Sequence, residues 1–151
     1  MQTDFLLASG HHVLLLILVS MLAGEAAVLR QAPTPAALRS LSRLDRLYGA
    51  SAAALLAVGV SRLFWGAKPA AFYAANPAFW LKLGAFLLVG AISVVPTLAF
   101  IRWGRAVRAD PAWLPDAAQW AKARRLAIAQ LHLLAVVVIA AAAMARGIGH
   151  L

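Results

Sequence analysis

The stretch RLFWGAKPAAFYAANPAFWLK, from Arg62 to Lys82, joins two long apolar segments and decides how the chain is organised. Its two terminal cations lie inside the ends of those segments. Aromatic side chains fill the sequence between them, namely Trp65, Phe72, Tyr73, Phe79 and Trp80. Tryptophan and tyrosine settle at the depth of lipid headgroups, and long cationic side chains reach the same layer by snorkelling. The stretch therefore predicts a connection at a membrane–water interface.

The composition of the whole chain agrees with a membrane protein. Of its 151 residues, 64% are hydrophobic and only 13% are charged, which is far outside the range of water-soluble domains. The net charge of +9 comes from basic residues in short connections, where they set the orientation in the bilayer rather than bind nucleic acid. Cysteine is absent from the sequence, which excludes disulfides, iron–sulfur clusters and thiol catalysis.

Four apolar segments are each about long enough to cross the roughly 30 Å hydrocarbon layer as a helix. They cover about residues 5–29, 47–64, 79–101 and 126–145. The sequence therefore predicts an all-α fold, an integral membrane four-helix bundle that forms one transmembrane domain over residues 1–151.

Helix starts are marked by a capping side chain followed by proline or by a capping box. Thr34-Pro35 and Asn76-Pro77 follow the first pattern, and Asp116 with Gln119 follows the second. After Thr34, leucines alternate with arginines at helical spacing up to residue 46. We expect this segment to lie along the membrane surface before the chain enters the bilayer.

The distribution of cations predicts the direction of the helices. The connections after the first and third spans carry most of them, namely Arg30, Arg39, Arg43, Arg46, Arg102, Arg105, Arg108, Lys122, Arg124 and Arg125. Both connections should be cytoplasmic under the positive-inside rule. Both termini would then lie outside, in the periplasm if this is a bacterial inner-membrane protein.

Polar side chains at the outer ends of the helices form a candidate cofactor site: His11, His12, Arg62 and Lys82 share one layer at 1.5 Å per residue. Ionisable residues within membrane helices are costly and are functional candidates by default. Alternatively, the two cations only snorkel to the headgroups. Imidazole can ligate haem iron or a metal, and we take His12 as the candidate ligand, with His11 as the alternative. The other interpretation is that both are packed or interfacial histidines without a ligand.

Haem is one cofactor that this layer could hold. Adjacent histidines point about 100° apart, so one of them at most faces a central site readily. His132, in the fourth span, is a possible second ligand, but it lies roughly 10 Å or more deeper than His12. A single histidine ligand, with Arg62 or Lys82 near the haem propionates, fits the layer better.

The inner ends of the helices carry a second polar group. Glu25 cannot remain charged and unpaired at its depth, so we expect an arginine partner. The candidates for a structural ion pair are Glu25, Asp45 and Arg46. Such a pair would fix the register of the helices without any catalysis.

The chain resembles an uncharacterised family of small bacterial membrane proteins, a domain of unknown function. The similarity covers the whole chain and is carried by Asp45-Arg46-Leu47-Tyr48-Gly49, Gly59, Arg62, Phe72-Tyr73, Asn76 to Lys82, Pro96-Thr97 and Trp103. More distantly, it resembles HemJ-type protoporphyrinogen oxidases and CopD-like membrane proteins, through His11 or His12 and Trp80-Leu81-Lys82. The HemJ resemblance implies haem b and a redox reaction.

Three functional hypotheses follow. The first is a haem-associated or redox-related membrane protein. The second is a non-catalytic membrane component that binds a partner or lipid through its basic cytoplasmic surface. The third is a small transporter or metal-handling protein, for which four short spans would need to form a homo-oligomer; its scattered methionines and lack of cysteine make copper a poor match.

Overall fold

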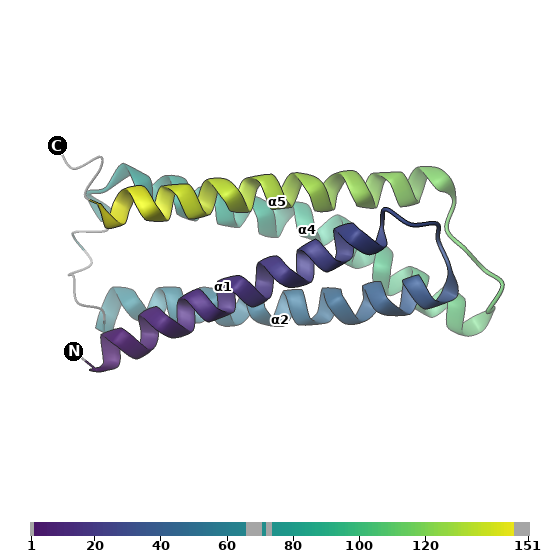
Figure 1. The fold of residues 1–151 in the computed structure, drawn as a ribbon, viewed down its shortest axis with the longest axis horizontal. Helices are drawn as coiled ribbons and strands as arrows, with labels where there is room; N and C mark the ends of the chain where they lie inside the picture. Colours follow the sequence, from purple (N-terminus) through teal and green to yellow (C-terminus); the bar gives the residue numbers. More distant parts are fainter. Residues whose placement is uncertain (1, 66–70, 72–73, 147–151) are drawn as a thin grey trace.

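The computed structural model describes residues 2–65, 71 and 74–146, except for the side chains at positions 4, 63 and 145. The described residues form four long helices: α1 (Gln2–Val28), α2 (Pro35–Trp65), α4 (Pro77–Ala109) and α5 (Ala117–Ala145). They run alternately up and down as a bundle (Figure 1). The predicted all-α four-helix bundle is confirmed.

The bundle is built from two hairpins. Helix α1 packs mainly against α2, and α4 packs mainly against α5, while the contacts of α2 with α4 and of α1 with α5 are much thinner. One end of the bundle is formed by the start of α1, the end of α2, the start of α4 and the end of α5 (Figure 1). We call this the histidine end, after His11 and His12, and the opposite end the tryptophan end, after Trp103 and Trp120.

The three predicted helix starts are confirmed by their caps. The side chains of Thr34, Asn76 and Asp116 accept hydrogen bonds from backbone N–H groups of the first helical turn. The Asp116 bond, 2.7 Å from Gln119 N, is the one that the capping box requires. Because the first N–H groups of a helix have no partner within it, these oxygens fix where each helix begins.

The expected surface helix over residues 35–46 is wrong. This segment is the first part of the unbroken helix α2, and its leucines Leu38 and Leu41 are fully buried within the bundle. Arg39 and Arg43 are exposed on the other face. The helix is amphipathic, as the alternation predicts, but its apolar face packs on neighbouring helices and not on lipid. A sequence pattern alone does not distinguish these two environments.

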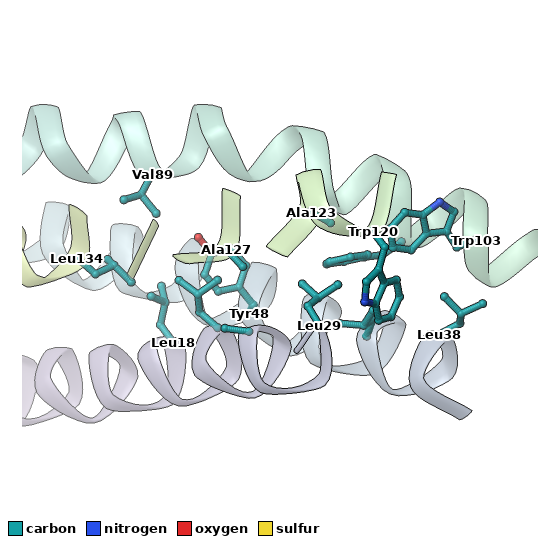
Figure 2. Close-up of a cluster of buried hydrophobic side chains, with 14 of the residues drawn as sticks. Leu18, Leu29, Leu38, Tyr48, Val89, Trp103, Trp120, Ala123, Ala127 and Leu134 are labelled. Atoms are coloured by element: carbon teal, nitrogen blue, oxygen red, sulfur yellow. The ribbon is translucent and has the colours of Figure 1, made fainter. Parts of the chain in front are cut away.

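A dense aromatic core closes the tryptophan end (Figure 2). The indole rings of Trp103 and Trp120 stack with centroids 5.6 Å apart, and Phe100 lies 5.6 Å from Trp103. Trp120 Nε1 donates a 3.0 Å hydrogen bond to the carbonyl of Gln31, in the connection between α1 and α2. This bond ties the start of α5 to the other hairpin.

Three of the helices are long and apolar enough to cross a membrane, within Phe5–Val28, Pro77–Ala109 and Ala117–Met144. The outer surfaces of these three helices carry large exposed hydrophobic side chains, such as Leu16, Leu87 and Ile139. Helix α2 is not among the three, so its predicted span over residues 47–64 stays a prediction. Phe72 and Tyr73 of the predicted interfacial belt lie outside the described residues.

Candidate functional site

A cavity of about 190 Å³ opens near the histidine end of the bundle. Most of its wall is apolar and comes from all four helices, including Leu15, Leu55, Phe86 and Val137. Three of the predicted site residues also line it: His11, His12 and Lys82. The structure therefore brings together residues that are 70 positions apart in the sequence, while their role as cofactor ligands stays a prediction.

His11 lines the cavity and packs beside Gly59 of α2. A Cβ atom placed on Gly59 would lie 3.5 Å from His11 Cε1, an ordinary van der Waals contact. The Nδ1 atom of His11 is buried and has no hydrogen-bond partner among the described residues. A buried imidazole nitrogen without a partner is costly in a stable protein, and a ligand in the cavity could satisfy it.

His12 is more exposed and is held in one tautomer. Its Nδ1 lies 2.6 Å from the carbonyl oxygen of Ala8, which can only accept, so Nδ1 carries the proton. The neutral ring then has its lone pair on Nε2, the arrangement that histidines use when they ligate a metal or haem iron. The two rings meet edge to face, with centroids 6.2 Å apart.

Lys82 and Arg62 place two cations beside the histidines. Lys82 Nζ lies 5.3 Å from the centre of the Phe79 ring, a cation–π contact, and its stem lines the cavity. Arg62 does not line the cavity, but it is close enough to interact electrostatically with both His11 and Lys82. The Nε atom of Arg62 is buried and has no hydrogen-bond partner in the part of the chain that the structure describes.

No carboxylate contacts either cation among the side chains that the structure describes. Two neighbouring positive charges, both partly withdrawn from solvent, repel each other and lose hydration. An anionic group in the cavity would offset both costs. The arrangement is therefore suited chemically to a ligand with an apolar body and a negatively charged end.

A metal centre is less well supported by the geometry. Among the described residues, no three side chains of the His, Cys, Asp or Glu type come together. His132 is exposed on α5 and is not part of the cavity wall, so it does not join His11 or His12.

The predicted ion pair at the inner helix ends does not form among the described residues. Arg46 is exposed and its Nε donates to the Ser42 carbonyl, whereas Glu25 is 2% exposed and its Oε1 has no hydrogen-bond partner. Asp45 instead accepts a 2.7 Å hydrogen bond from Thr97 Oγ1. The arginine lies one residue along the helix from Asp45, about 100° around its axis, and so faces away from the core.

Sequence reasoning missed the apolar wall of the cavity and the role of Gly59. Leu55, Phe86 and Val137 look like every other apolar residue in their helices, and nothing in their spacing marks a cavity. Gly59 did carry a signal, because it stands three residues before Arg62 and therefore on the same face of α2. A glycine beside a buried cation allows a neighbouring side chain to approach the backbone closely.

Comparison with known proteins identifies a family. A family model described as "Predicted membrane protein (DUF2214)" matches residues 3–149, nearly the whole chain. No curated protein and no solved structure matches significantly.

Proposed function

Because the chain belongs to the DUF2214 family of predicted membrane proteins, we propose a function within the bilayer: binding of an amphipathic anion in the cavity at the histidine end. Haem b is the first ligand to test. The protein would then be a haem-associated membrane protein, and the redox chemistry would be supplied by the haem.

The observation that carries this proposal is the pair of partly buried cations, Arg62 and Lys82, beside an apolar cavity. A lysine or arginine within a membrane helix costs about 2.5 to 3.5 kcal/mol on insertion scales. Snorkelling relieves part of that cost, but Arg62 Nε is buried and Lys82 lines the cavity wall. A carboxylate or phosphate between the two side chains would make charge-assisted hydrogen bonds with both.

Haem fits the donor set of this site. The lone pair that Ala8 leaves on His12 Nε2 is available to iron, and the haem propionates are the anionic groups that Lys82 and Arg62 would hold. The volume of about 190 Å³ is smaller than the roughly 300–1,000 Å³ of typical ligand pockets. The cavity would therefore hold one part of the macrocycle.

An absorption spectrum of the purified protein tests the haem assignment. Protein expressed with ample haem should show a Soret band that shifts on reduction; His12→Phe should lose the band, and Lys82→Met should weaken it. His132→Phe is the matched control, because His132 is exposed on α5 away from the cavity. A wild-type protein without a Soret band would contradict the haem assignment.

A non-catalytic membrane component that binds anionic lipid or an acidic partner through its arginine-rich surface is the second candidate, and a specific observation favours it. Exposed arginines gather at the tryptophan end, which suits a lipid headgroup surface or an acidic membrane partner: Arg30, Arg39, Arg43, Arg46, Arg102, Arg105 and Arg108. Native mass spectrometry from nanodiscs of mixed lipids would separate the two candidates. If the wild type retains anionic lipid and Lys82→Met does not, the lipid binds in the cavity. If lipid is lost only when the charges of Arg39 and Arg43 are reversed, the lipid binds to the arginine surface.

The orientation in the membrane is part of the proposal. The exposed arginines support a cytoplasmic tryptophan end and an outer histidine end, which in a bacterium would face the periplasm. Since the chain has no cysteine, Gln2→Cys and Ala112→Cys give single labelling sites at opposite ends of the bundle. A membrane-impermeant maleimide applied to intact spheroplasts should label the first variant and leave the second unlabelled. The reverse pattern would invert the orientation.

A further inference from the structure

A second polar cluster lies in the interior of the bundle, toward the tryptophan end and apart from the cavity. Glu25 of α1 and Asp45 of α2 are 2% and 7% exposed, and they lie close enough to interact electrostatically. Tyr48, one turn along α2 from Asp45, is also buried and interacts with both carboxyl groups. Figure 2 shows Tyr48 within the apolar core, between Leu18 and Leu29.

The groups that face the two carboxyls from the other helices are neutral. Thr97 of α4 donates its hydroxyl to Asp45 Oδ1 at 2.7 Å. The Tyr48 hydroxyl donates at 3.1 Å to Gln130 Oε1 of α5, and the Gln130 amide donates to the carbonyl of Leu126 in its own helix. Ser93 of α4 also lies within reach of Tyr48. All four helices thus contribute polar atoms to one buried site.

No cation balances the two carboxyl groups within the described residues. The nearest arginine in sequence, Arg46, is exposed and donates to the Ser42 carbonyl. Asp45 has a hydroxyl donor, but Glu25 Oε1 is buried with no hydrogen-bond partner. Two ionised carboxylates that are buried and interact with each other are disfavoured, because each loses its hydration and repels the other.

We propose that Glu25 and Asp45 form an intramembrane proton-binding site, which holds one exchangeable proton between two carboxyl groups. The hydrogen bond from Thr97 stabilises a negative charge on Asp45, so the proton resides on Glu25, the carboxyl without a donor. A proton needs no coordination shell, whereas a metal ion would need several further oxygens around it. The two carboxyls therefore titrate as a coupled pair.

Infrared spectroscopy of the full chain in lipid nanodiscs tests this assignment. At neutral pH the wild-type protein should show the C=O stretching band of one protonated carboxylic acid. The band should shift to lower frequency in D₂O, because the acid proton exchanges for deuterium. Glu25→Gln should remove the band. The matched control is Asp110→Asn, an exposed acidic residue at the end of α4, which should leave the band unchanged.

The variant Asp45→Asn distinguishes a coupled pair of carboxyl groups from a single buried acid. It also tests the proposal if Glu25→Gln does not fold. Without the neighbouring negative charge, the remaining Glu25 band should change its pH dependence relative to the wild type. An unchanged pH dependence, or the absence of a protonated carboxyl from the wild type at neutral pH, would overturn the proposal. Loss of the wild-type band in sodium chloride but not in potassium chloride would also overturn it, because the site would then bind a metal cation.

Discussion

The two ends of the bundle contain the same four helices but are built in opposite ways. At the tryptophan end, Trp103 and Trp120 stack on each other and fill the space between the hairpins. At the histidine end, a cavity takes that space, and His11 and Arg62 each have a buried nitrogen atom without a hydrogen-bond partner among the described residues. Within the described part of the chain, one end is therefore filled by packed side chains, and the other contains a cavity beside polar atoms.

This contrast matters more in a membrane than in water. Lipid chains are as apolar as the core, so the helices gain little from hiding apolar surface and depend on close van der Waals packing and hydrogen bonds between them. The aromatic stack and the Trp120–Gln31 hydrogen bond are such contacts. Substitutions at the tryptophan end should therefore change stability, and substitutions at the histidine end should change binding.

The largest effect should come from Trp103→Ala. Truncation of a buried tryptophan leaves a large void, for which about 3 to 5 kcal/mol of stability is the usual loss. Unfolding of the purified protein by increasing mole fractions of SDS would measure it. Trp80→Ala is the control at the histidine end, because Trp80 is 57% exposed and should cost under about 1 kcal/mol. Equal losses for the two variants would remove the contrast between the ends.

Gly104→Ala should destabilise the bundle by about 1 to 3 kcal/mol through overpacking. A Cβ atom there would lie 2.7 Å from Ser42 Oγ, which is held by hydrogen bonds to the carbonyls of Leu38 and Phe100. Adding Ser42→Ala should recover part of the loss, and the double-mutant cycle in SDS unfolding would measure the coupling. Gly84→Ala is the matched control, since nothing lies within 4 Å of its added Cβ.

Lys82→Met should weaken ligand binding by about tenfold or more, because a hydrogen bond to a charged group contributes about 1.5 kcal/mol or more. Its stability without ligand should stay equal to that of the wild type or rise, since a half-buried charge has been removed. Titration of the purified protein with haem, followed by absorption, gives the affinity. Lys122→Met, on the exposed face of α5, is the control. If the Lys82→Met variant binds haem normally but unfolds at a lower SDS mole fraction than the wild type, Lys82 is a structural residue and not a binding residue.

The smallest effect should come from the helix caps, with similar losses at both ends of the bundle. Asp116→Ala and Asn76→Ala each remove one side-chain acceptor from a first helical turn, for about 1 kcal/mol. Helix content by circular dichroism and SDS unfolding would measure both. Similar losses of stability for the two variants would show that the two ends differ in side-chain packing and not in helix capping. A far larger loss for Asn76→Ala would show that the Asn76 side chain also contributes to packing at the histidine end.

The sequence predicted what depends on local chemistry. The caps at Thr34, Asn76 and Asp116 and the four helices follow from short-range rules, and the structure confirms them. Helical rise also predicts that His11, His12 and Lys82 lie at the same end of the bundle, and they line one cavity there, while their membrane depth and their role stay predictions. The predictions that were wrong depend on the rotation of a helix about its axis and on which helices surround it. Arg46 is exposed and does not pair with Glu25, and Leu38 and Leu41 are buried within the bundle instead of facing the membrane surface.

The unequal contacts between helices have a consequence for how the protein can be assembled. Helices α1 and α2 form one extensive pair and α4 and α5 form another, while the two pairs touch much less. We therefore expect a chain cut between α2 and α4 to reconstitute from two coexpressed fragments. The hydrogen bond from Trp120 Nε1 to the Gln31 carbonyl joins one pair to the other at the end of the bundle opposite the cut, and it would help to set the register of the two fragments.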